Sequence, residues 1–173
     1  MTLEYEVTLD DLVEFNLYHF DHSRTFLRRR YLNRYGLPAM VVLALVIVTY
    51  PPTGGTFVSG FMTAGLWIAI WPRIERRATR KHITKFYREG QNKALLGKHM
   101  LQLLPDTIVE TTDHGETSVS WDAVEKIVKA GDKIYVYINA VTAFVVPRRA
   151  FPTEEAFNEF FATVTKSKSQ YAG

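Results

Sequence analysis

The sequence lacks cysteine, and one long internal stretch lacks charge. With no cysteine among 173 residues, disulfide bonds and thiolate metal sites are excluded. Residues 35–72, which lie between Arg34 and Arg73, contain no Asp, Glu, Lys or Arg. The first 30 residues lack the apolar core of a secretory signal peptide, because carboxylates interrupt them. A long uncharged run without a signal peptide predicts an internal membrane segment.

Most of the cations lie on either side of the uncharged run. Twelve of the 21 basic residues fall within residues 24–34 and 73–88, with Glu75 as the single carboxylate there. These two segments, here called the basic collars, therefore carry a net charge of +11. The rest of the chain holds 9 basic and 17 acidic residues, or −8. The overall charge of +3 thus combines two basic collars with an acidic body.

The uncharged run reads as a helical hairpin. Two apolar arms, residues 37–50 and 57–71, are separated by the helix-breaking sequence of residues 51–55. Each arm has about 15 residues, or roughly 22 Å of helix, whereas a hydrocarbon core is about 30 Å thick. We expect both helices to extend outward, through Tyr31 and Ile74, with the arginines of the collars reaching the headgroups. The sequence therefore predicts two transmembrane helices.

A re-entrant hairpin is the main alternative, because two helices buried in a soluble protein would need a larger core than this chain can build. The loop between the arms is short and uncharged, so both collars lie on one side, which the positive-inside rule makes the cytoplasm. We expect a multi-pass protein of the inner membrane with both termini cytoplasmic. Small residues at Thr56, Gly60 and Ala64 could seat the first arm or a second copy, so a homodimer stays open.

The segments outside the hairpin predict one β-rich domain. Residues 3–9 alternate as a half-buried strand, and Thr8 with Asp11 suggests the start of a helix that leads to the first arm. A second helix is expected to run from the second arm to about Leu96. Six strands follow, separated by turns, and then a helix capped by Thr153. The predicted ranges are 99–104, 107–112, 116–121, 124–129, 133–138 and 142–146 for the strands, and 154–165 for the helix.

The predicted fold class is α+β. Six strands, a seventh at the N-terminus and a C-terminal helix are the inventory of a pleckstrin-homology-like (PH-like) barrel or sandwich. The chain then divides into four segments: 1–34, an N-terminal strand and amphipathic helix; 35–72, the transmembrane hairpin; 73–97, a basic juxtamembrane helix; and 98–173, the cytoplasmic PH-like domain.

Three runs in this order resemble the YcxB-like membrane proteins of bacteria. They are Glu14–His19 before the hairpin, Leu95–His99 at the start of the β domain, and Ala143–Phe151 before the final helix. The resemblance covers nearly the whole chain. It implies an inner-membrane protein with two spans and a cytoplasmic β-rich domain, and it brings no catalytic residues.

The sequence offers cations rather than catalytic groups as site candidates. His19 and His22 flank Asp21 on a predicted helix, but Asp21 would point to another face, so we expect no metal site. No nucleophile–base pattern or phosphate loop is present, and we expect no catalytic residue, no cofactor and no enzyme activity. The residues predicted to contact anionic lipid or a partner are Arg73, Arg76, Arg77, Arg80, Lys81, Lys85, Arg148 and Arg149.

The predicted function is that of a membrane-tethered binding or scaffold module. Its expected partners are the anionic headgroups of the bilayer and a protein at the cytoplasmic face, and no nucleic acid is expected. One alternative is a small transporter or channel subunit, or an immunity-type membrane protein, that acts through its spans. Another is a membrane-bound enzyme of unknown reaction.

Overall fold

The computed structural model describes residues 1–89 and 95–171, and the chain divides into two compact units. The β unit comprises Met1–Tyr18 and Thr84–Gly173, and the hairpin unit comprises His19–Ile83. In sequence, the hairpin unit is therefore an insertion within the β unit. The fold class is α+β, as predicted.

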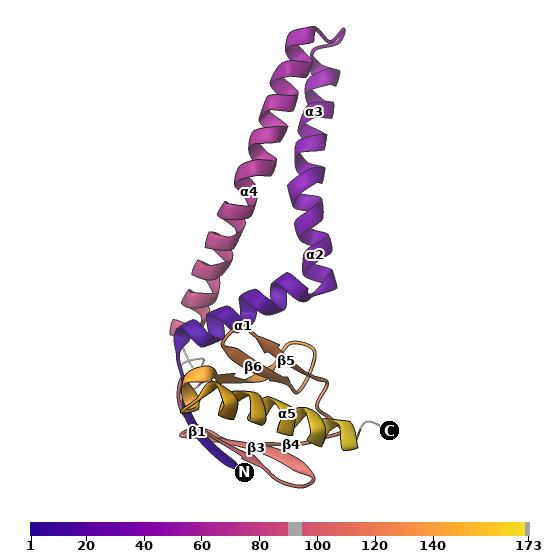
Figure 1. Cartoon of the computed structure of the whole chain (residues 1–173). Helices are drawn as coiled ribbons and strands as arrows, with labels where there is room; N and C mark the ends of the chain where they lie inside the picture. The colour runs from indigo at the N-terminus through magenta and orange to yellow at the C-terminus, as the bar shows by residue number, and fades with distance from the viewer. Residues whose placement is uncertain (90–94, 172–173) are drawn as a thin grey trace. The chain divides into compact units, whose positions relative to one another are not determined.

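The β unit contains seven strands in two antiparallel sheets (Figure 1). The first sheet has the order β1-β2-β3-β4, and the second has the order β5-β6-β7. Their bounds are β1 Thr2–Val7, β2 Gly97–Leu103, β3 Thr107–Thr112, β4 Gly115–Ser120, β5 Lys126–Ala130, β6 Lys133–Tyr137 and β7 Ala143–Pro147. The described strands form these two separate sheets and no closed barrel.

The N-terminal strand belongs to the first sheet. β1 pairs antiparallel with β2, with Tyr5 opposite His99 and Val7 opposite Gly97. Its burial alternates, because Tyr5 and Val7 face the core while Glu4 and Glu6 are exposed. This confirms the prediction that the N-terminal strand folds with the C-terminal β-rich segment.

The core of the β unit draws on both sheets and on the last helix. All five residues of β6 are buried, which a strand covered on both faces requires. Helix α5, Glu154–Gln170, contributes Phe157, Phe160 and Val164, which are all at most 2% exposed. The Oγ1 of Thr153 accepts a hydrogen bond from the backbone N–H of Ala156 at 3.2 Å, so the predicted cap is confirmed.

Helix α1, Leu9–His22, starts with the predicted capping pair. The backbone N–H of Thr8 donates to Oδ2 of Asp11 at 2.8 Å, and the N–H of Asp11 donates to Oγ1 of Thr8 at 3.4 Å. The two side chains thus satisfy two of the free donors at the start of the helix. Leu12, Val13 and Phe15 then bury their side chains in the β unit.

The hairpin unit holds two helices that are long and apolar enough to cross a membrane, Arg24–Val48 and Gly54–Arg88. The first consists of α2, Arg24–Tyr31, the π-helical segment η1, Leu32–Gly36, and α3, Leu37–Val48. The second is α4, whose last turns, from Thr84, belong to the β unit. At 1.5 Å per residue they measure about 37 and 52 Å, so both exceed a hydrocarbon core of about 30 Å. Both helices extend beyond the apolar arms into the basic collars, through Tyr31 and Ile74, as expected.

A proline accounts for the π-helical segment. The ring of Pro38 has no N–H to donate and would crowd the preceding turn of an α-helix. A π-helical turn widens the backbone there. In a π-helix the carbonyl of Asn33 would accept a hydrogen bond from the backbone N–H of residue 38, but Pro38 has no N–H. The side chain of Trp67 supplies the donor instead, because its Nε1 donates to the carbonyl of Asn33 at 3.2 Å. This bond joins η1 to α4.

The two arms approach closely at Gly60. A Cβ added there would lie 3.5 Å from both Cγ atoms of Val42 and 3.9 Å from Cδ1 of Leu45. Gly60, one of the three small residues singled out in the sequence, thus seats the first arm. At the turn, Thr53 caps α4 by accepting from the N–H of Thr56 at 3.3 Å.

Helix α4 continues through Pro72 and ends at Arg88. The sequence predicted a helix to about Leu96, and residues 90–94 of that range lie outside the described residues. Pro72 removes one backbone hydrogen bond without ending the helix. The strand boundaries differ from the predicted ones by at most two residues, the usual scatter at element ends.

Candidate anion-binding site

The basic collars face each other across a cleft in the hairpin unit. The cleft has a volume of about 660 Å³ and opens between α2–η1 and α4. Its lining residues are Asp21, Arg30, Arg34, Ala69, Pro72, Arg73, Glu75 and Arg76. Four arginines and two carboxylates give it a net charge of +2. We call it the arginine cleft.

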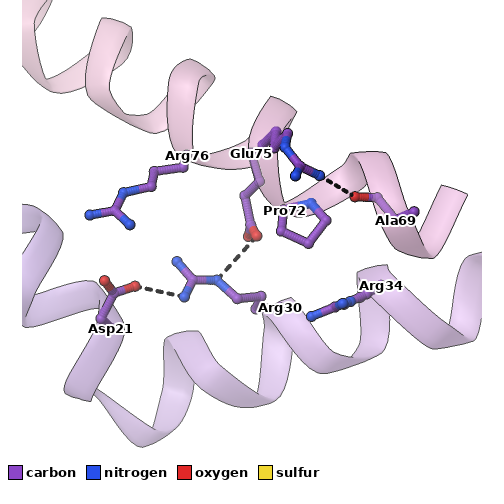
Figure 2. Close-up of a pocket in the computed structure, with 8 residues that line it drawn as sticks. Asp21, Arg30, Arg34, Ala69, Pro72, Glu75 and Arg76 are labelled. Atoms are coloured by element: carbon purple, nitrogen blue, oxygen red, sulfur yellow. Dashed lines mark hydrogen bonds and ion pairs between the residues drawn. The ribbon is translucent and has the colours of Figure 1, made fainter.

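One of the four arginines is held by both carboxylates. Figure 2 shows Arg30 lying between Asp21 and Glu75. Nη1 of Arg30 donates to Oδ1 of Asp21 at 2.6 Å, and its Nε donates to Oε2 of Glu75 at 3.1 Å. These three side chains bridge α1, α2 and α4 and carry a net charge of −1. Arg30 therefore holds the wall of the cleft in place. Because two carboxylates already bind its guanidinium group, we do not count Arg30 among the residues that would bind a further anion.

The other three arginines have no carboxylate partner among the described residues. Nη1 of Arg73 donates to the backbone carbonyl of Ala69 at 3.1 Å, and the guanidinium of Arg34 lies 5.4 Å from the ring centre of Tyr35. Nε of Arg34 is buried and has no hydrogen-bond partner in the described part of the chain. A buried donor without a partner is costly, so it is expected to meet a ligand or water.

The arginine cleft sits at the border of the uncharged run. Arg34 is the last charged residue before it, and Arg73 is the first one after it. Aromatic rings gather at the same level: Tyr31 packs on Tyr35 with ring centres 4.7 Å apart, and Trp67 stacks on Trp71 at 4.6 Å. Paired Tyr and Trp beside arginine is the composition of a membrane–water interface.

The cleft takes in only part of the predicted contact set. Arg73 and Arg76 line it, whereas Arg77, Arg80 and Lys81 are exposed elsewhere on α4. Lys85, in the part of α4 that belongs to the β unit, lies 3.8 Å from Glu89. Sequence reasoning missed Arg30 and Arg34 as site residues. Both belong to the basic cluster of residues 24–34, which is visible in the sequence. That their side chains face α4 depends on how the two helices pack, which the sequence pattern does not show.

Arg148 and Arg149 lie in the β unit and are engaged within it. Nη1 of Arg148 donates to the carbonyl of Phe151 at 2.8 Å. Arg149 forks onto both carboxylate oxygens of Asp11 and donates to the carbonyl of Glu6 at 2.7 Å. Anion binding by this pair stays a prediction, and the structure adds that Arg149 has an internal carboxylate partner.

Asp11 is the centre of an ion network that the sequence did not reveal. It is 2% exposed, and Lys133, itself buried, lies 3.7 Å from its Oδ1. Lys133 also contacts the carboxylates of Glu14 at 2.5 Å and Asp132 at 2.9 Å. Burial opposes the ionised form of Asp11, but hydrogen bonds from Arg149 and Thr8 outweigh it and lower its pKa to about 2.

A second polar group lies inside the β unit. Glu110 accepts hydrogen bonds through Oε1 from the hydroxyl of Tyr5 at 2.9 Å and from Nδ1 of His99 at 3.0 Å. Burial and then the charge of Glu110 raise the pKa of Tyr5 well above its usual value. The three side chains join β1, β2 and β3. His99 and Glu110 line a cavity of about 250 Å³ with mostly apolar walls.

The comparisons with known proteins point to the C-terminal part of the chain. The model of the YcxB-like protein family matches residues 103–164, which run from the end of β2 into α5. Neither the curated proteins nor the solved structures gave a match. The residues that pair with β1 and those that carry the arginine cleft lie outside the matched range. The resemblance noted from the sequence is thus confirmed for the C-terminal part of the chain, where residues 103–164 form a YcxB-like domain and include the run Ala143–Phe151.

Proposed function

We propose that the protein is a membrane-anchored binding module. The two long helices cross the inner membrane as a hairpin, both termini face the cytoplasm, and the YcxB-like domain binds a protein or an anionic lipid there. The observation that carries this proposal is the exposure of the apolar helices. In each one, only 6% of the most apolar 18-residue window is buried within the protein. Such surface is stable in lipid and costly in water.

The orientation rests on the collars. Cations at one end of both helices, and none at the turn, match the charge bias of cytoplasmic ends. The cations of the collars would attract anionic headgroups, at about 1 kcal/mol for each cation near the surface. Arg77, Arg80, Lys81 and Lys85 belong to this diffuse attraction in our proposal. Arg148 and Arg149 are a separate candidate contact on the YcxB-like domain.

The proposed fold of the domain is PH-like. The support is the order of its parts, which are a sheet of four strands, a sheet of three strands and a C-terminal helix. In this reading the membrane hairpin is inserted between the first and second strands. We favour binding over catalysis because the sequence contains no nucleophile–base pattern and no phosphate loop. A transport role is disfavoured because residues 35–72 contain no Asp, Glu, Lys or Arg.

Cysteine labelling tests the topology directly, because the natural chain has no cysteine to remove. Single cysteines at Thr2, Thr53 and Ser169 would be treated in intact cells with a reagent that cannot cross the inner membrane. We expect labelling at position 53 only, and at positions 2 and 169 only after lysis. Labelling of position 53 only from the cytoplasmic side would instead indicate a re-entrant hairpin.

A further inference from the structure

We propose that the arginine cleft binds the phosphomonoester headgroup of an anionic phospholipid through Arg34, Arg73 and Arg76. This inference deepens the proposed function and rests on it, because the cleft meets lipid only if the hairpin is in the membrane. It narrows a diffuse attraction between twelve cations and the bilayer to one site, three side chains and one chemical group.

The charges of the cleft select the ligand. Arg30 is held by Asp21 and Glu75. This leaves three guanidinium groups that have no carboxylate partner among the described residues, and the cleft has a total charge of +2. A phosphomonoester carries about −1.5 to −2 at neutral pH. A phosphodiester or a carboxylate headgroup supplies less charge at one point. Arginine also offers paired N–H donors that fit the oxygens of a phosphate group.

The lining of the cleft draws arginines from both helices. Arg34 projects from η1, and Arg73 and Arg76 project from α4, one and four residues after Pro72. Figure 2 shows Arg34 and Arg76 on facing helices, with the Arg30–Glu75 bridge between them. The buried Nε of Arg34 is a donor that has no partner in the described residues and that a phosphate oxygen would satisfy.

The position of the cleft favours a lipid over a soluble phosphate. Arg34 and Arg73 are the charged residues that bound the uncharged run on either side. A group held between them lies at the headgroup level if residues 35–72 occupy the hydrocarbon core. The stacked Trp67–Trp71 pair and the tilted Tyr31–Tyr35 pair, at the same level, are suited to glycerol and upper acyl chains.

The test compares two triple variants of the full-length protein in nanodiscs. The cleft variant carries Arg34→Gln, Arg73→Gln and Arg76→Gln. The control variant carries Arg28→Gln, Arg77→Gln and Lys81→Gln, which remove the same charge from the same two collars outside the cleft. The nanodiscs contain phosphatidic acid or phosphatidylserine at equal mole fraction. Native mass spectrometry after transfer to mild detergent counts the lipid that stays bound.

We expect the natural protein and the control variant to retain phosphatidic acid in preference to phosphatidylserine. The cleft variant should retain roughly tenfold less, as the loss of charge-assisted hydrogen bonds implies. A conservative variant with lysine at the three cleft positions should retain an intermediate amount, because the charge stays and the paired donors are lost. That variant also separates ligand loss from misfolding.

Three outcomes would overturn the inference. Equal losses in the cleft and control variants would indicate diffuse attraction, and equal retention of phosphatidylserine would exclude phosphomonoester selectivity. Displacement of the lipid by an equal concentration of glycerol 3-phosphate would indicate a site for soluble phosphate. Each of these leaves the anchor intact. Failure of the natural protein to insert into nanodiscs would instead contradict the proposed membrane anchor, and with it the proposed function.

Discussion

At the residue scale, the β unit depends on one buried carboxylate. Asp11 caps α1 through Thr8, binds Arg149 two residues after β7 and lies beside Lys133 of β6. Both Lys133 and Arg149 are more than 100 positions from Asp11 in the sequence. A buried ion pair is not a large source of net stability, but removing one partner leaves the other charge without compensation. Asp11 is therefore the position where a small chemical change should have a large effect.

Replacing Asp11 with Asn should lower the free energy of unfolding by about 2 to 4 kcal/mol, because Lys133 and Arg149 lose an anionic partner. Thermal unfolding of the full chain in mild detergent would measure this. The change Asp113→Asn, in the exposed turn after β3, is the matched control and should have little effect. Equal melting temperatures for the natural protein and the Asp11 variant would contradict the prediction.

The same network predicts a dependence on acidity. The pKa of Asp11 is about 2 in the folded chain and about 3.8 when exposed, so ionised Asp11 stabilises the fold above pH 4. This contribution, about 2 kcal/mol, should disappear as the pH falls from 4 towards 2. Unfolding measured across this range should show a steeper loss for the natural protein than for Asp11→Asn. Parallel curves would show that Asp11 does not carry the effect.

At the element scale, Gly60 is the position where α3 and α4 approach each other closely. Replacement of Gly60 by Ala should be tolerated, since 3.5 Å to Val42 is an ordinary contact. Replacement by Leu should push α3 and α4 apart and cost about 1 to 3 kcal/mol, seen as a lower melting temperature in detergent. If Gly60→Leu instead changes the oligomeric state at constant melting temperature, the small-residue face binds a second copy.

The pairing of β1 with β2 predicts that a C-terminal fragment alone is incomplete. A fragment of residues 97–173 would expose the edge of β2 and the contacts that Tyr5 and Val7 cover. Linking residues 1–11 to its N-terminus should restore part of the stability, measured as a higher midpoint in denaturant. The same addition with Val7→Asp is the control, because a charge there cannot enter the core. No difference between the three fragments would place β1 elsewhere.

Local patterns explain which elements could be predicted from the sequence. Gly131, with φ of +59°, and the run of β-branched and aromatic residues in 133–137 with its flanking turns locate β6 to within a residue. The cap of α5 at Thr153 is equally local. Contacts across distant segments could not be read in this way. No periodic pattern in the sequence predicts the Asp11–Arg149 ion pair or the position of Arg34 opposite Arg73. Each depends on how separate elements pack.

At the scale of the whole molecule, anchoring is the property to test first. Alkaline carbonate and high salt should both leave the protein in the membrane pellet, because salt screens the collar charges without affecting apolar burial in the bilayer. Fractionation followed by immunoblotting measures this, with a peripheral membrane protein as the control. Release by carbonate would contradict the anchored reading. The cleft variant should also remain in the pellet, since it alters headgroup contacts only.

The insertion of the hairpin between β1 and β2 has a consequence for biosynthesis. Eighty-nine residues separate Val7 from Gly97, the last pair of the β1–β2 ladder. At roughly 5 to 20 residues per second, the ribosome needs on the order of ten seconds to make them. During that time β1 waits without its partner strand, while both apolar helices emerge and can be delivered to the membrane. The first sheet is completed only after the hairpin has been synthesised, so under the proposed function the hairpin would be targeted before this sheet closes.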